Sequence, residues 1–130
     1  MPFYRDTDHL YTLLRALFEE LQSHPGNPVD DLTRSRLTIH LQTSLPAGEI
    51  LIDGRVRPAT VYFGNLPKLR PVLKIELQGD TLHRILLDEL SLKEALARKQ
   101  IIVHGPVWKT MSLAEIFSQG RKLYPRIVGQ

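Results

Sequence analysis

Hydrophobic side chains recur along the first part of the chain with the spacing of an amphipathic helix. Between residues 7 and 23 they occur every three or four positions, and charged side chains largely take the opposite side. Thr7 or Asp8 is a suitable N-cap, and Pro25-Gly26 ends the segment. The pattern predicts one helix that must pack on another apolar surface through Leu10, Leu13, Leu14, Leu17, Phe18 and Leu21.

After a loop at 27–35 with room for one helical turn, the hydrophobic period changes to two, which is typical of strands buried on one side. Turn signals at 46–48, at Asp53-Gly54 and at 65–67 divide this region. Four strands in succession predict an antiparallel meander covered on one side. The predicted strands are 36–42, 49–53, 57–64 and 72–78.

Helices resume after Gly79, where Asp80 is a natural N-cap for a helix with leucine and isoleucine on its inner face. The segment 91–94, Ser-Leu-Lys-Glu, has the pattern of a capping box and predicts a second helix from about Leu92. The all-apolar segment 101–103 predicts a short buried strand.

A second capping box, at 112–115, predicts the start of a last helix, with Met111 packed on Ile116. Pro125 is expected to end this helix. Its inward side chains are expected to be Leu113, Ile116, Phe117, Leu123 and Tyr124.

The order helix, four strands, two helices, strand, helix predicts an α+β fold. The simplest packing is a five-stranded, mainly antiparallel sheet with helices covering one face. A chain of 130 residues is near the usual size of one domain, so we expect a single domain over 1–130.

Composition agrees with a soluble globular protein, with 42% hydrophobic and 24% charged residues and no cysteine. The sequence shows neither a signal-peptide pattern nor an apolar run of about 18 residues, so a cytoplasmic protein is expected. The net charge of +3 is spread along the chain, and only Tyr62 stands clearly among the basic residues of the strands. These features predict a solvated outer sheet face and no nucleic-acid binding.

Patterns that carry catalysis or metal binding are absent. The five histidines do not have the spacing of metal ligands, and only His104, at the end of a strand, stands where a ligand contact or a structural hydrogen bond is expected. No nucleophile or phosphate-loop motif occurs, and Ser91 and Ser112 are explained as helix caps. We therefore expect no enzyme activity, no metal and no cofactor.

Apolar faces, in contrast, are more numerous than one sheet face plainly needs. Two helices, a strand and a third helix all follow the first four strands, and each has hydrophobic side chains to bury. Such a surplus either packs into a solid core or encloses a pocket.

The segment 79–108 resembles the sterol carrier protein family, in its type-two, nonspecific lipid-transfer branch. The resemblance rests on Gly79-Asp80 before a helix, on Leu-Ser-Leu-Lys-Glu-Ala-Leu-Ala at 90–97, and on a short strand followed by Gly105-Pro106-Val107-Trp108. Leu113 and Phe117 match the last helix of that family, and the preceding elements agree in order and length. The chain ends in Ile-Val-Gly-Gln and not in a peroxisomal signal, so a stand-alone lipid-binding version is expected.

The resemblance implies an apolar cavity between sheet and helices that binds a fatty acyl, phospholipid, isoprenoid or sterol-like molecule. An empty cavity of about 300 Å³ would cost several kcal/mol, so the free form should be partly collapsed, hydrated or filled. The alternative is a protein interaction module with a solid core and no ligand. The ligand-binding residues are predicted to be Phe18, Ile39, Phe63, Ile75, Leu86, Val103, Trp108, Met111, Phe117 and Tyr124.

We expect the last helix to be the mobile wall of this cavity, because Gly120 weakens its interior. Arg121, Lys122 and Arg126 are candidates to hold it at an anionic membrane surface.

Overall fold

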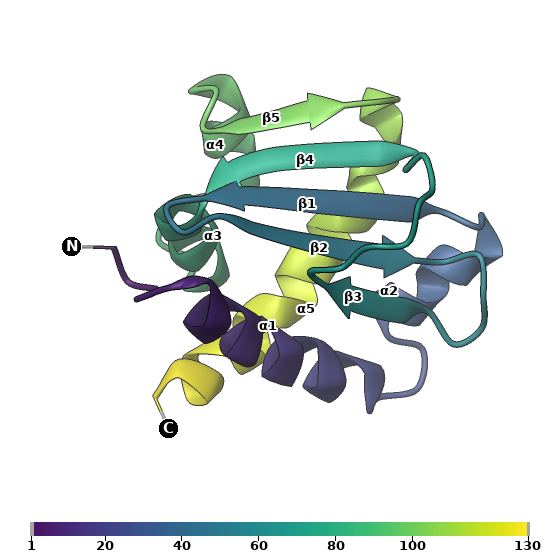
Figure 1. Ribbon diagram of the computed structural model, residues 1–130, viewed down its shortest axis with the longest axis horizontal. Helices are drawn as coiled ribbons and strands as arrows, with labels where there is room; N and C mark the ends of the chain where they lie inside the picture. The colour runs from purple at the N-terminus through teal and green to yellow at the C-terminus, as the bar shows by residue number, and fades with distance from the viewer. Residues whose placement is uncertain (1, 130) are drawn as a thin grey trace.

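Five strands form one sheet, and helices cover one of its faces, in the computed structural model (Figure 1). The structure describes residues 2–129, with the side chain of Val107 left out. The elements are α1 (Thr7–Gln22), α2 (Pro28–Asp31), the 3-10 turn η1 (Leu32–Arg34), β1 (Thr38–Ser44), β2 (Gly48–Asp53), β3 (Thr60–Phe63), β4 (Leu73–Gln78), α3 (Gly79–Leu86), α4 (Leu92–Ala97), β5 (Ile101–His104), the 3-10 turn η2 (Val107–Lys109) and α5 (Thr110–Val128). The α+β fold with a five-stranded, mainly antiparallel sheet is confirmed.

The strand order is β3-β2-β1-β4-β5, which places β1 at the centre of the sheet. β1 pairs antiparallel with β2 and parallel with β4, where Ile39 lies opposite Leu73. The prediction of a four-strand meander is therefore wrong for the fourth strand. The segment after β3 crosses the front of the sheet in Figure 1 and returns the chain to the end at which β1 starts. β4 consequently runs in the direction of β1, with β5 antiparallel on its far side.

Helix α1 begins at Thr7, where the periodic segment begins, but neither Thr7 nor Asp8 is its N-cap. Its N-cap is Asp6, whose Oδ1 accepts a hydrogen bond from the backbone N of His9 at 2.8 Å. Thr7 lies inside the helix, and its hydroxyl donates instead to the carbonyl of Ala47. The loop after α1 holds both α2 and η1, which is more than the one helical turn expected.

The two predicted capping boxes have different outcomes. Ser91 caps α4 as predicted, because its Oγ accepts a hydrogen bond from the backbone N of Glu94 at 3.0 Å. The box at 112–115 is wrong: α5 begins at Thr110, directly after η2, so Ser112 lies within its first turn. Met111 is 70% exposed, so it cannot form the predicted buried contact with Ile116.

Two further helix boundaries also differ from the prediction. Gln78 is the N-cap of α3, and Asp80 lies in the first turn, where its Oδ1 accepts a hydrogen bond from the backbone N of Phe3 at 2.8 Å. Pro125 does not end α5, which continues to Val128. A proline removes one backbone donor, and near the end of a long packed helix that loss is tolerated.

The core lies between the covered sheet face and the helices. Alternate residues of the strands point into it, and β5 takes part only through its first residue and, partly, its third. Because β5 is an edge strand, Ile102 is 49% exposed, so the prediction of a fully buried strand is wrong. The sheet contributes Ile39, Leu41, Ile50, Ile52, Leu73, Ile75, Leu77 and Ile101, and the helices contribute Leu10, Leu14, Leu17, Phe18, Leu21, Leu82, Ile85, Leu86, Leu113, Ile116, Phe117 and Tyr124.

Candidate functional site

The interface between the sheet and the helices contains a small apolar void. Its volume is about 20 Å³, far below the roughly 300–1,000 Å³ of pockets that hold drug-sized ligands. The void is therefore closed in this conformation. Its lining is entirely hydrophobic and comes from α1, β1, β2, α3 and α5: Leu14, Leu17, Phe18, Leu41, Ile52, Leu82, Leu86, Leu113, Ile116 and Phe117.

The ten predicted ligand-binding residues fall into three groups. Phe18, Leu86 and Phe117 line the void itself. Ile39, Ile75 and Tyr124 are buried in the same core without lining the void, and Phe63 and Val103 are half-buried at its margin. Trp108 and Met111 are 73% and 70% exposed, so the structure does not bring them into the interior. The sequence missed the other seven lining residues, although apolar periodicity marked all of them except Ile52 as inward-facing. They are Leu14, Leu17, Leu41, Ile52, Leu82, Leu113 and Ile116.

Gly120 is a point at which α5 lies close to two neighbouring helices. A Cβ atom there would lie 3.2 Å from Leu86 on α3 and 3.7 Å from Leu17 on α1. Both of these leucines line the void. The absence of a side chain at Gly120 thus lets α5 lie close against the wall of the void.

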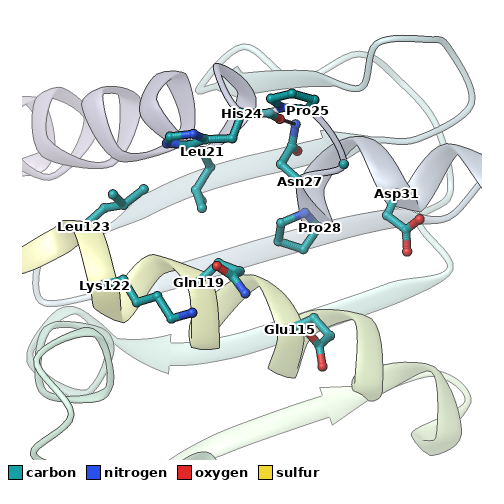
Figure 2. A pocket seen from close by; sticks show the side chains of 11 residues that line it. Leu21, His24, Pro25, Asn27, Pro28, Asp31, Glu115, Gln119, Lys122 and Leu123 are labelled. Atoms are coloured by element: carbon teal, nitrogen blue, oxygen red, sulfur yellow. Dashed lines mark hydrogen bonds between the residues drawn. The ribbon is translucent and has the colours of Figure 1, made fainter.

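A second hollow, on the surface, follows the same pair of helices. This groove of about 540 Å³ lies between the end of α1 with α2 on one side and α5 on the other (Figure 2). Leu21 and Leu123 give it an apolar part, and its polar residues include His24, Gln119 and Lys122. On α1 and α5, the residues that line the groove lie within about two helical turns of the residues that line the void. Groove and void therefore lie near each other along the α1–α5 contact.

A buried polar cluster joins the C-terminal half of α5 to α3 and to the N-terminal segment. The hydroxyl of Tyr124 is hydrogen-bonded to the hydroxyl of Tyr4 and lies 2.7 Å from Nδ1 of His83. The ring of Phe3 stacks on His83 with 3.6 Å between centroids. The sequence assigned Tyr124 to an apolar wall, and periodicity alone gives no sign that its hydroxyl has partners 41 and 120 residues away.

Burial shifts the pKa of each titratable side chain in this cluster. Desolvation raises the pKa of Tyr4 and of Tyr124 well above 10, so both hydroxyls stay protonated. Desolvation also lowers the pKa of His83 below its ordinary value, against the opposing effect of Glu89 and Asp80. The cluster is consequently neutral near pH 7, with two hydroxyl donors and one imidazole to share two hydrogen bonds.

The basic residues predicted to face a membrane are mostly engaged elsewhere. Arg121 donates from Nε to the carbonyl of Ile85 at 2.9 Å and lies 3.8 Å from a carboxylate oxygen of Asp88. Arg126 reaches Glu20 on α1 at 3.3 Å. These contacts hold α5 against the protein. His104, in turn, makes the structural hydrogen bond expected of it, at 2.5 Å to Glu76 on β4.

Metal-binding groups do not gather anywhere in residues 2–129: no set of three His, Asp or Glu side chains is placed to hold an ion. Within the same residues, no helix is both long enough and apolar enough to cross a membrane.

Solved structures with the same arrangement are mostly sterol carrier protein 2 domains. The domain from Helicoverpa armigera superposes with a TM-score of 0.68 at 14% identity, covering 87% of this chain and 88% of that one. The apo form from Yarrowia lipolytica gives a TM-score of 0.65 at 13% identity, covering 88% and 91%. The chain has the sterol carrier protein 2 fold.

Another neighbour with the sterol carrier protein 2 fold was solved with a lipid. It is the palmitated sterol carrier protein 2-like 2 of Aedes aegypti, with a TM-score of 0.53 at 13% identity over 78% of this chain and 90% of that one. No protein-family profile and no curated protein sequence matches the chain. The resemblance noted from the sequence is thus confirmed at the level of the fold.

Proposed function

We propose that the protein binds one long hydrophobic molecule between its sheet and helices α1, α3 and α5, and carries it without chemical change. The observation that carries this proposal is the void whose ten lining side chains are all apolar, in a sterol carrier protein 2 fold. An acyl chain in that position would lose contact with water, at about 0.8 kcal/mol for each buried CH₂ group. The palmitated state of a protein with the same fold supports this class of ligand.

Binding requires the void to enlarge, and α5 is the wall that moves. Its contact with Leu17 and Leu86 passes over Gly120, so no side chain of α5 interlocks with its neighbours at that point. Moving the first half of α5 away from α1 joins the void to the groove, which extends along α5 to Glu115. The net affinity is then the gain from burying the ligand minus the cost of separating the two helices.

The side chains that line the void and the groove also determine which ligands the protein selects. No charged or hydrogen-bonding side chain lines the void, so the buried part of the ligand is selected by length and shape. Of the void and the groove, only the groove offers polar groups, which include Lys122 and the carboxylates of Asp31 and Glu115 as well as His24 and Gln119. A fatty acid or a related single-chain lipid, with its polar end left in the groove, fits this distribution.

A second candidate function follows from the size of the void. At about 20 Å³ the interior is nearly solid, as expected of an interaction module that binds no ligand. The two functions differ in whether a lipid enters the interior.

Native mass spectrometry of the protein as purified from cells, before and after organic extraction, separates these functions. We expect an added mass of one lipid that extraction removes, and displacement of a fluorescent fatty acid by unlabelled palmitate. Ile116→Trp, which fills the void, should weaken fatty-acid binding at least tenfold, whereas Leu45→Trp, at a site 64% exposed, should not. Repeated absence of lipid together with no fatty-acid binding would favour the interaction module.

A further inference from the structure

Exposed apolar side chains are concentrated in one short part of the chain. Seven large hydrophobic side chains are exposed among the described residues, and four of them fall between residues 96 and 111. The four are Leu96, Ile102, Trp108 and Met111, with exposed fractions of 37%, 49%, 73% and 70%. We refer to these four residues as the β5-edge surface.

These residues follow one margin of the molecule. β5 is an outer strand of the sheet, with α4 at its start and η2 and the first turn of α5 at its end (Figure 1). Leu96 lies on α4, Ile102 on β5, Trp108 on η2 and Met111 at the start of α5. None belongs to the void or to the groove. The β5-edge surface therefore lies apart from both the void and the groove.

The charges along the β5 edge are almost all positive. Residues 95–114 contain Arg98, Lys99 and Lys109 and no aspartate or glutamate. Of the nearby carboxylates, Glu94 pairs with Arg98 at 2.7 Å and Glu76 is hydrogen-bonded to His104, while Glu115 lines the groove beside α5. The hydrogen bond from His104 holds the pKa of Glu76 below its ordinary value.

Lys109 and Trp108 are arranged as a pair. The ammonium of Lys109 lies 5.0 Å from the centre of the indole ring, within the range of a cation–π contact. An indole ring has an apolar body and one hydrogen-bond donor, which suits it to the boundary between lipid headgroups and acyl chains. A lysine beside it places a positive charge at the level of the lipid phosphates.

We propose that the β5-edge surface docks the protein on an anionic lipid bilayer, with Trp108 and Met111 inserted among the headgroups and Lys99 and Lys109 on the lipid phosphates. The positive charge of residues 95–114 favours an anionic partner over a neutral one, and the exposed pair of Trp108 and Lys109 favours a bilayer over an acidic protein. Docking here leaves Arg121 and Arg126 in their contacts with Ile85 and Glu20. The proposal does not depend on whether the interior binds a ligand.

Trp108 is the only tryptophan of the chain, so its fluorescence reports on this surface directly. Two kinds of vesicle are added to the full-length protein. One contains phosphatidylcholine alone, and the other also contains about 30% phosphatidylglycerol, which gives it a strong negative surface potential. We expect a blue shift and quenching by brominated lipid chains only with the anionic vesicles, and loss of both at high salt. Unchanged emission with anionic vesicles would overturn the proposal.

Flotation with the same vesicles tests the named residues. Trp108→Ala with Met111→Ser should weaken binding about tenfold or more, and Lys99→Glu with Lys109→Glu should weaken it at least as much. The matched controls are Leu45→Ala and the pair Arg5→Glu with Arg84→Glu, which are exposed but lie outside this surface. Equal loss in controls and test variants would contradict the proposal. So would a blue shift that depends on protein concentration without vesicles, because it would indicate pairing of β5 edges between two copies.

Discussion

The hydroxyl of Tyr124 on α5 lies 2.7 Å from Nδ1 of His83 on α3. The same hydroxyl is hydrogen-bonded to that of Tyr4, which precedes α1. Three segments that are far apart in sequence thus meet at one buried oxygen. Because the proposed mechanism moves α5, this cluster determines which part of the helix stays in place. The half of α5 that contains Tyr124 is held by these hydrogen bonds. Within the described residues, the first half, at Leu113 to Phe117, is free of such bonds.

Removing the central hydroxyl should loosen α5. Tyr124→Phe leaves the Tyr4 hydroxyl and Nδ1 of His83 without their shared partner in a buried place. Such a loss costs about 1–3 kcal/mol, measurable as a lower urea midpoint at pH 7.5. Fatty-acid uptake in stopped-flow measurements should become faster. Tyr62→Phe, on β3 and away from the cluster, serves as the control and should change stability by less than about 0.5 kcal/mol.

Acidification should destabilise the protein through His83. Its pKa in the folded protein lies below the ordinary value of 6.5, because burial disfavours the imidazolium. The unfolded chain therefore binds the proton at a higher pH than the folded one, so stability is complete above about pH 6.5 and falls as the pH drops below that value.

Urea unfolding between pH 7.5 and pH 5 measures this dependence. The same series on His83→Gln should show a shallower decline, because the substitution removes the imidazole whose pKa burial lowers. Identical pH profiles for the two proteins would show that His83 is not the group responsible.

Gly120 offers a test of the helix contact. In Gly120→Ile the added side chain meets Leu86 and Leu17, where even a Cβ is 3.2 Å from the first and 3.7 Å from the second. We expect a loss of about 1–3 kcal/mol in the free protein from overpacking. If α5 moves outward when a ligand enters, bound palmitate should reduce that loss. A thermal-shift series with and without palmitate measures it, and an equal penalty in both states would mean that α5 does not move at Gly120.

Much of the fold follows from local patterns in the sequence. The change in hydrophobic period near Arg36 separates helix from sheet, and Ser91 caps α4 as its spacing to Glu94 predicts. These features depend on neighbours within four residues. The parallel pairing of β4 with β1 depends instead on the path of the chain at 64–72, which no short-range pattern encodes.

The candidate site was only partly predictable for a related reason. Periodicity identifies Phe18 and Phe117 as inward-facing, and both line the void. Trp108 and Met111 were predicted to be buried because they are hydrophobic, but exposed apolar residues are common in proteins. Both residues follow the edge strand β5, where the next layer of the fold does not cover them. A cavity that is partly collapsed in the free form was expected from the family resemblance, but its volume could not be predicted, because it depends on the close approach at Gly120.

The central claim is that a lipid chain enters the space between sheet and α5. Solution NMR of the methyl-labelled protein with palmitate tests it most directly, through intermolecular contacts between the acyl chain and assigned methyl groups. We predict contacts to Leu41 and Ile52 on the sheet and to Ile116 on α5, which line the void from opposite sides. Contacts confined to the surface residues Leu45 or Ile102, or no contacts at saturating palmitate, would contradict the account.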